Sequence, residues 1–214
     1  LRHDSLDRNV LRQERAVSMS EQVTEVVHEY TPHGAARELW NLQANELLME
    51  GPAGTGKTRA LLEYINFLCE RYAGIRCLLL RQTRESLTES VLVTFEQDVL
   101  WENHPAIHGT SSRNTRQNYH YPNGSHIVVG GLDKPAKTFS TQYDVIAVFE
   151  AREITADTWE WLARANRNFK MPWQMRVADT NPAGEFHWLN THFPQGFREV
   201  PDRHRQDKRV RLLS

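Results

Sequence analysis

One octapeptide has the residue types and spacing of a phosphate-binding loop. It reads GPAGTGKT and matches the pattern G-x-x-x-x-G-K-[ST] in full. Glycines let successive backbone N–H groups turn toward an anion, and a helix that follows adds partial positive charge at its N-terminus. The motif therefore predicts binding of ATP with Mg²⁺, with Lys57 at the β and γ phosphates and the Thr58 hydroxyl on the metal. The residues of the loop are Gly51, Pro52, Ala53, Gly54, Thr55, Gly56, Lys57 and Thr58.

A second candidate for chemistry is Glu150, a carboxylate that ends the apolar run DVIAVF. Such a run predicts a buried strand of a parallel sheet, and catalytic groups gather where these strands end. Hydrolysis of a nucleotide needs a group that orients or activates the attacking water. We therefore predict that Glu150 is this catalytic carboxylate.

The residue before Glu150 departs from the usual pattern of nucleotide hydrolases. Such enzymes place an aspartate there to help hold magnesium, but this chain has Phe149, which offers no ligand. Strand alternation points positions 149 and 150 to opposite faces, so the phenylalanine does not displace the carboxylate. The candidate metal residues are then Thr58, Glu150 and, as an outer-shell helper on the neighbouring strand, Asp179. We expect weakened metal affinity in the isolated domain.

Two polar residues, Thr180 and Asn181, end the next apolar run, QMRVADTNP. They follow Glu150 at the corresponding end of a second buried strand, where hydrogen bonds to the γ phosphate are within their chemistry. Ordinary turn chemistry before Pro182 is the alternative interpretation.

Hydrolysis also needs positive charge at the transition state. Arg81 and Arg84 follow the end of an apolar strand, so we favour one of them near the nucleotide. Lys134, Lys137 and Arg152 are the candidates for a boundary between subunits. For each of these residues a solvated surface charge is the alternative.

The elements that must position these residues alternate along the chain. Apolar runs predict strands at residues 46–50, 75–81, 144–149 and 174–182. Segments that predict helices follow them at residues 59–74, 84–102, 155–169 and 184–193. Asn123-Gly124 lies between two alternating segments and predicts a β-hairpin. The order predicts an α/β fold, a mostly parallel, doubly wound sheet flanked by helices with an antiparallel hairpin insertion.

Composition bounds the class of protein. A chain of 214 residues with 39% hydrophobic and 25% charged residues fits one substantial globular domain. The net charge of -1 gives no global attraction to nucleic acid, so such contacts must come from local patches. No apolar run has the length of a membrane span, and the N-terminus lacks a signal-peptide pattern, which predicts a soluble intracellular protein.

Cysteine and histidine predict no metal site. Cys69 and Cys77 lie in apolar runs and are expected to be buried free thiols, as in a reducing compartment. His104 and His108 have helical spacing, but Pro105 lies between them and no nearby side chain completes a ligand set. We therefore expect surface histidines.

Four segments together resemble the ATPase domain of the large terminase subunit of tailed bacteriophages, the motor that packages double-stranded DNA into preformed capsids. The resemblance implies a P-loop NTPase fold of the RecA/ASCE-like kind and ATP hydrolysis coupled to DNA translocation. It runs from about Tyr30 to Phe193. The segments, in the family's order, are GPAGTGKT, LLLRQTRESLTESVLVTFE, NGSHIVVGGLDKPAKTFSTQYDVIAVFEAREIT and ADTNPAGEFHWLN.

The resemblance also implies roles for particular residues. Lys57 and Thr58 would belong to the Walker A element, and Glu150 would be the catalytic carboxylate of Walker B. Thr180 and Asn181 would form the coupling motif, which links hydrolysis to DNA movement.

Two further implications concern the base and the positive charge. The segment from Tyr30 to Arg37 corresponds to the adenine-contacting region of the family, with packing of Tyr30 in the core as the alternative. Several terminases carry an arginine within the Walker A loop, where this chain has Ala53. In such ring motors a neighbouring subunit often supplies an arginine to the γ phosphate.

The implied partners are those of a packaging machine. They are double-stranded DNA, the portal protein, the small terminase subunit and further copies of the chain in a ring, with a monomer in isolation and no membrane. The place of action would be the host cell cytoplasm, transiently at the procapsid. Arg113 and Arg116 of the polar hairpin loop are candidate grips on DNA phosphates, because backbone charge is independent of base sequence.

The expected organisation has three parts. Residues 1–28 are expected to form an N-terminal helical extension, residues 29–196 the P-loop ATPase domain, and residues 197–214 a linker or the start of a lid subdomain. Terminases of this kind continue into an RNase H-like nuclease domain. No such domain lies within this chain, so we expect weak or conditional ATP hydrolysis and no DNA cutting.

Two other interpretations stay open. A helicase-like P-loop ATPase would share the phosphate loop and the glutamate, and it predicts strand separation. A nucleotide-gated assembly module with impaired hydrolysis follows if Phe149 marks a lost metal site.

Overall fold

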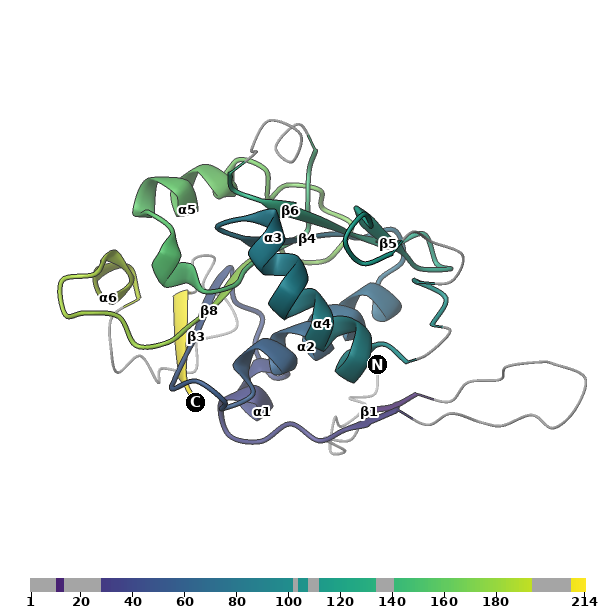
Figure 1. Ribbon diagram of the computed structural model, residues 1–214, viewed down its shortest axis with the longest axis horizontal. Helices are drawn as coiled ribbons and strands as arrows, with labels where there is room; N and C mark the ends of the chain where they lie inside the picture. The colour runs from purple at the N-terminus through teal and green to yellow at the C-terminus, as the bar shows by residue number, and fades with distance from the viewer. Residues whose placement is uncertain (1–10, 14–27, 102–103, 108–111, 134–140, 194–208) are drawn as a thin grey trace, which may run out of the picture.

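The apolar runs form one mixed sheet in the computed structural model, which describes residues 11–13, 28–101, 104–107, 112–133, 141–193 and 209–214. Helices lie on both sides of this sheet (Figure 1). Among the described residues it has seven strands in the order β5-β6-β4-β7-β8-β3-β9. Their bounds are β3 Glu46–Glu50, β4 Arg76–Arg81, β5 Asn118–His120, β6 His126–Gly131, β7 Val145–Val148, β8 Met175–Thr180 and β9 Arg209–Leu213.

The strand order brings three strand ends together. Every neighbouring pair in the sheet is parallel except β5 with β6. β8 lies between β3, which leads into the phosphate loop, and β7, which leads to Glu150. Because parallel strands end at the same edge, the candidate residues that follow β3, β7 and β8 meet there. The predicted α/β fold is confirmed.

Helices cover the two faces of the sheet with separate buried clusters. Leu61 and Ala147 belong to the cluster on one face, and Trp159 and Val148 belong to the cluster on the other. Alternate residues of β7 thus serve both faces, which explains its unbroken apolar sequence. The helices of the first face include α1 (Ala35–Leu39) and α2 (Lys57–Arg71), and those of the second are α5 (Ala156–Ala163) and α6 (Trp188–His192).

The helix predicted at residues 84–102 ends at Val99 and contains two π turns. Its parts are α3 (Arg84–Ser86), η1 (Leu87–Val91), α4 (Leu92–Thr94) and η2 (Phe95–Val99). The hydroxyls of Thr88 and Ser90 donate to carbonyls four residues earlier, at distances of 2.9 and 2.6 Å. Such bonds compete with the backbone ladder and accompany bending of helices.

The predicted hairpin at Asn123-Gly124 is confirmed, and it belongs to the main sheet. Gly124 has φ 85°, a conformation that glycine adopts at little cost. β5 pairs antiparallel with β6, and β6 pairs parallel with β4. The hairpin therefore extends one edge of the sheet instead of forming a separate insertion.

Both ends of the chain differ from expectation where they are described. Leu11–Gln13 forms strand β1, which pairs antiparallel with β2 (His28–Tyr30), where helix was expected. The rest of the expected helical extension lies outside the described residues. At the other end, Arg209–Leu213 is strand β9 of the main sheet, not a linker. Val210 and Leu212 of β9 enter the buried cluster that contains α2, which fixes this strand beside β3.

The cysteine expectation holds, and the histidine one is wrong for His104. Cys69 and Cys77 are free and fully buried, with sulfur atoms 3.5 Å apart. The ring of His104 is buried and accepts a hydrogen bond from the backbone N–H of Ala106 at 2.9 Å, so it is a core residue. His108 lies outside the described residues. In the described part of the chain, no helix combines the length and the apolar character needed to cross a membrane.

Candidate nucleotide-binding site

The phosphate loop connects β3 to α2, as the motif requires. Gly54 and Gly56 have φ 81° and 80°, values that favour glycine, and α2 begins at Lys57 immediately after them. A side chain at Gly51 would collide with the backbone carbonyl of Ser214. The N-terminus of a helix of 15 residues thus faces the loop, which is the arrangement that binds phosphate.

Lys57 joins the loop to the end of β8. Its ammonium group donates to the carbonyls of Gly51 and Pro52 at 2.8 and 2.7 Å, and it lies 3.3 Å from the side-chain oxygen of Asn181. The backbone N–H of Gly51 donates to the carbonyl of Thr180 at 3.3 Å. The structure therefore brings Thr180 and Asn181 to the phosphate loop. Thr180 is fully buried, which leaves Asn181 as the more accessible of the two.

Asp179 bridges the phosphate loop and the Glu150 turn. The Thr58 hydroxyl donates to Oδ2 at 2.5 Å, and the backbone N–H of Glu150 donates to Oδ1 at 2.8 Å. Burial raises the pKa of Asp179 to about 6, against the lowering effect of these two hydrogen bonds. Asp179, which the sequence analysis assigned to the outer shell of the metal, thus accepts hydrogen bonds from both sides of the site.

Glu150 occupies a strained turn beyond the end of β7. Its φ and ψ are both 54°, in the left-handed region that non-glycine residues rarely adopt. Strain of this kind concentrates at functional sites. Its Oε2 atom is buried and has no hydrogen-bond partner among the described residues, although Nε of Arg152 lies 3.8 Å away. A buried carboxylate oxygen in this state fits a site for water or a cation.

The residues at this edge suit Mg²⁺. Magnesium takes oxygen ligands and is commonly held by one or two carboxylates together with the phosphates of the nucleotide. The Thr58 hydroxyl, the Asp179 carboxylate and the orphaned oxygen of Glu150 supply such oxygens. In the part of the chain that the structure describes, no group of three or more His, Cys, Asp and Glu side chains forms a complete metal cage. The oxygens of Thr58, Asp179 and Glu150 fit a magnesium ion that shares the phosphates of a nucleotide.

The two arginines after β4 have different surroundings. Arg81 donates to Glu153 at 2.9 Å and to Ser90 at 2.9 Å, and these contacts place it beside the Glu150 turn. The hydrogen bond to Glu153 raises the pKa of Arg81, and the charges of Glu153, Glu150 and Asp179 add to the effect. Arg84 instead donates to the backbone carbonyl of Arg116 at 2.7 Å. Of the two, Arg81 is the one near the candidate site.

Arg152 is the most exposed basic residue of this turn. Its side chain is 49% exposed, whereas that of Glu150 is 30% exposed. About half of its side chain is therefore open to solvent. Lys134 and Lys137, the other candidates for a subunit boundary, lie outside the described residues.

Tyr30 lies in an aromatic cluster beside α2. Its ring centroid is 5.6 Å from that of Trp40, and the guanidinium of Arg59 lies 5.5 Å from the Tyr30 centroid. Burial raises the pKa of Tyr30 to about 12, with a further contribution from Glu63. These contacts match the alternative of core packing, while Arg59, next to Thr58, keeps Tyr30 close to the phosphate loop.

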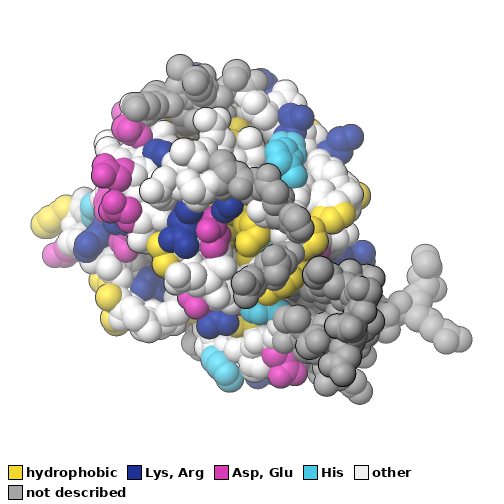
Figure 2. Space-filling model, turned by 45° about the vertical axis from the view of Figure 1, so that its right-hand side comes forward, with side chains coloured by type: hydrophobic (Ala, Val, Ile, Leu, Met, Phe, Trp, Pro, Cys, Tyr) yellow, Lys and Arg dark blue, Asp and Glu magenta, His cyan; other side chains and the backbone are white. Residues whose placement is uncertain are grey.

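The predicted DNA grips lie on the segment before β5, and both contact Glu96. Arg116 is 7% exposed and forms an ion pair with Glu96, and Nε of Arg113 lies 3.1 Å from the same carboxylate. The Tyr119 hydroxyl also donates to Glu96, at 2.7 Å. The prediction is wrong for Arg116, because its charge is already compensated inside the protein. On the face shown in Figure 2, basic and acidic side chains are interspersed.

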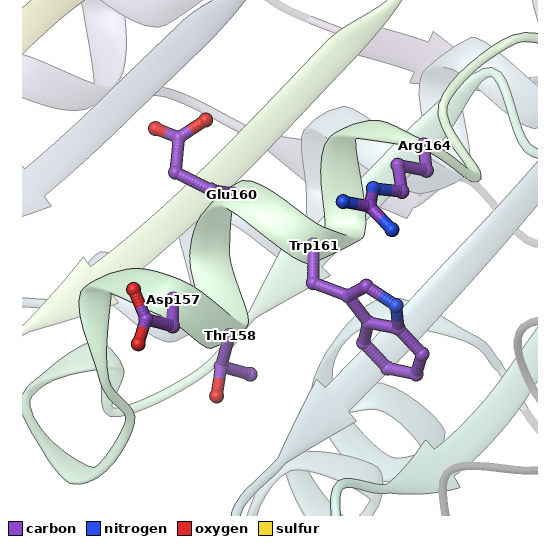
Figure 3. Close-up of a pocket in the computed structure, with 5 residues that line it drawn as sticks. All are labelled: Asp157, Thr158, Glu160, Trp161 and Arg164. Atoms are coloured by element: carbon purple, nitrogen blue, oxygen red, sulfur yellow. The ribbon is translucent and has the colours of Figure 1, made fainter.

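A surface hollow on α5 does not belong to this site. Its lining consists only of residues from α5 and the position after it, and the side chains fan outward from the helix (Figure 3). None of them comes from the phosphate loop or from the ends of β7 and β8. The lining residues are Asp157, Thr158, Glu160, Trp161 and Arg164.

The sequence did not predict one buried ion pair, which lies beside the phosphate loop. Glu50, the last residue of β3, accepts from Nε of Arg211 at 2.9 Å, and Arg211 also donates to the Phe193 carbonyl at 2.7 Å. The Ser214 backbone N–H donates to the carbonyl of Glu50 at 2.8 Å. The available signal was a carboxylate at the end of an apolar strand, directly before Gly51.

The fold and the site define a P-loop NTPase of the RecA/ASCE-like class. The loop follows β3, the carboxylate follows β7, and β8 separates the two strands. The family model described as phage terminase large subunit matches residues 44–214. The chain belongs to this family. No protein of curated function matches it in sequence comparison.

Solved structures of large terminases share the fold. The ATPase domain of the Thermus phage P74-26 large terminase has a TM-score of 0.62 and 15% identity, covering 86% of this chain and 81% of that one. A large terminase from a thermophilic bacteriophage has a TM-score of 0.57 and 10% identity, covering 80% of this chain and 40% of that one. The same terminase in complex with ADP has a TM-score of 0.55 and 14% identity, covering 79% of this chain. The chain thus spans about 40% of the length of that thermophilic phage enzyme.

Proposed function

We propose that this domain binds Mg²⁺-ATP at the phosphate loop, hydrolyses it, and thereby drives translocation of double-stranded DNA into a procapsid. The observation that carries the proposal is the convergence of three strand ends. Lys57 and Thr58 from the loop, Glu150 after β7, and Asp179 and Asn181 from the end of β8 are joined by hydrogen bonds. Relatives with this fold have been solved with ADP and with ATP-gamma-S.

Each side chain has a part in this proposal. Lys57 exchanges its carbonyl acceptors for the β and γ phosphates, whose charge attracts the ammonium more strongly. Glu150 orients the attacking water with its free oxygen. Bound Mg²⁺, held by Thr58 and the carboxylates, would neutralise charge that develops on the phosphates. Asn181 senses the γ phosphate beside Lys57.

Positive charge for the transition state is assigned to two arginines. Arg81 acts within its own subunit, where its salt bridge to Glu153 fixes it beside the Glu150 turn. Arg152 acts on the site of a neighbouring copy in a ring, because its side chain is half exposed. An isolated chain is then a monomer with low activity.

The remaining partners follow from the family. We assign the chain to a packaging machine in the host cytoplasm, where it would meet double-stranded DNA, the portal protein and the small terminase subunit at the procapsid. The ATPase domain then comprises the main sheet and its helices, including β9.

Phosphate release tests the proposal. The domain at high concentration is given Mg²⁺-ATP with and without double-stranded DNA, and Lys57→Ala serves as the inactive reference. We expect release above the reference, and more of it with DNA. Release no faster than that of the reference, at every protein concentration and with DNA, would contradict the proposal. Strand displacement by the full-length protein would favour the helicase-like alternative.

A further inference from the structure

We propose that Asp179 performs the metal-supporting role of the aspartate that nucleotide hydrolases carry at the position of Phe149. In this chain the carboxylate lies on β8 instead of on the neighbouring strand β7, and it therefore lies next to the phosphate loop. This inference rests on the proposed function, because it concerns the metal that accompanies the nucleotide.

The strand register places the two positions side by side. In the parallel pair of β7 and β8, Ala147 aligns with Val177 and Val148 aligns with Ala178. Continuation by one residue aligns position 149 with position 179. Adjacent strands lie about 4.8 Å apart, so a carboxylate moved between these positions stays at the same depth in the sheet.

The two positions also share the face of the sheet that carries α2. Ala147 and Val177 belong to the buried cluster that contains Leu61 of α2. Alternation along a strand returns positions 149 and 179 to that face. Phe149 itself is 1% exposed and belongs to this cluster. The phenylalanine fills the core where a carboxylate would stand in other hydrolases.

Asp179 makes the hydrogen bonds expected of a carboxylate that supports a bound metal. One oxygen accepts from the hydroxyl of Thr58, the loop residue that ligates the metal in the proposed function, at 2.5 Å. The other accepts from the backbone N–H of Glu150 at 2.8 Å. Asp179 is 2% exposed and has no ion pair among those found in the described residues. The ammonium of Lys57 bonds to carbonyls and to Asn181. A cation beside Thr58 would compensate this buried charge.

A purely structural role is the competing explanation, since the same two hydrogen bonds hold the Glu150 turn. The two roles differ in their effect on metal affinity. The test uses Mn²⁺ in place of Mg²⁺, with ADP as the nucleotide, and measures bound Mn²⁺ by electron paramagnetic resonance.

We expect Asp179→Asn to weaken Mn²⁺ binding by about 10-fold to 100-fold, as loss of an outer-shell partner does at metal sites. ADP affinity in the presence of a chelator should stay within about twofold of the parent. Asp157→Asn, a change at an exposed aspartate of α5, is the matched control and should bind Mn²⁺ as the parent does. Equal Mn²⁺ affinity in Asp179→Asn and the parent overturns the inference.

A variant that returns the carboxylate from position 179 to position 149 tests the equivalence of the two positions directly. Asp179→Val should lose Mn²⁺ affinity, and the added change Phe149→Asp should restore part of it. No restoration in a folded double variant would count against the equivalence of the two positions.

The parent protein gives a readout that does not depend on a variant folding. Labelling of aspartate carboxyl groups with ¹³C should produce a ¹³C coupling in the pulsed spectrum of the Mn²⁺-ADP complex. Absence of this coupling overturns the inference. A parent that binds neither ADP nor Mn²⁺-ADP would instead contradict the proposed function.

Discussion

Lys57 connects the phosphate loop to the end of β8 through hydrogen bonds of a single side chain. Its ammonium group has three acceptors within 3.3 Å, two carbonyls of the loop and the amide oxygen of Asn181. The group is buried, yet its acceptors are neutral oxygens. Charged phosphate oxygens form stronger hydrogen bonds with an ammonium than neutral acceptors do. The same contacts thus shape the loop and hold the lysine where phosphate would bind.

The first prediction follows from these contacts. Lys57→Ala should weaken ATP binding by about 10-fold to 100-fold, because one charge-assisted hydrogen bond contributes about 1.5 to 3 kcal/mol. Calorimetry measures the affinity, with Lys170→Ala as a control at an exposed lysine. Unchanged affinity in Lys57→Ala would show that the nucleotide binds elsewhere.

The second prediction concerns Arg152. Arg152→Ala should leave ATP affinity of the isolated chain unchanged, because the proposed function assigns the half-exposed guanidinium to the site of a neighbouring copy. Turnover in an assembled ring should fall. Calorimetry and phosphate release measure the two quantities. If Arg152→Ala loses ATP affinity as a monomer, the arginine belongs to the site of its own subunit.

At the scale of elements, β9 depends on a buried ion pair. Arg211 of β9 is 2% exposed at its side chain and Glu50 of β3 is 6% exposed. The pair holds the outermost parallel strand against the strand that carries the phosphate loop. Removal of one partner leaves a buried charge without compensation.

The third prediction compares two arginines of β9. Arg211→Ala should lower the free energy of unfolding by about 3 to 5 kcal/mol, the usual cost of breaking a buried pair. Arg209→Ala, whose side chain is 52% exposed at 3.4 Å from Glu46, should cost about 1 kcal/mol or less. Urea denaturation measures both. Equal costs for the two variants would refute the structural role given to Arg211.

A second buried carboxylate, Glu46 at the start of β3, joins three elements. It lies 2.8 Å from Arg176 of β8 and accepts from Trp159 of α5 at 2.9 Å. It also contacts His192 of α6 at 2.5 Å. Burial alone would raise its pKa, but the hydrogen bonds from His192 and Trp159 and the charge of Arg176 lower it to about 2.

The fourth prediction is a pH dependence of stability from Glu46. Because the pKa of Glu46 is lower in the folded state, its ionised form stabilises the protein above the ordinary value of 4.5. This contribution should be lost as the pH falls from 4.5 toward about 2. Urea denaturation across this range should show a shallower loss for Glu46→Gln than for the parent. Identical pH profiles would contradict the shift.

At the scale of the whole molecule, local sequence patterns predicted the strands from β3 to β8, because each is an apolar or alternating run. They also predicted the loop, whose glycines are needed at fixed positions. Strand β9 was missed because RVRLL is short and charged, and its place depends on Glu50, which is 161 residues away in sequence. The ion pair of Arg116 was not predicted because its partner, Glu96 of η2, lies 20 residues earlier in the sequence.

The sequence predicted the strand of Asp179 but not both of its contacts. Sequence placed it at the end of β8 as an outer-shell helper of the metal. The structure places it in contact with both Thr58 and the Glu150 turn. This difference depends on the register between β7 and β8, which no local pattern encodes. The sheet order brings β8 between the other two strands and so makes Asp179 central.

The central claim is that Glu150 activates water for hydrolysis of ATP bound at the phosphate loop. The most direct test compares phosphate release by the parent and by Glu150→Gln, at equal high protein concentration with Mg²⁺-ATP and double-stranded DNA. Loss of the carboxylate should slow release by about 10²-fold or more, as loss of a general base does, while ATP affinity is retained. Equal release rates in the two proteins would contradict the account.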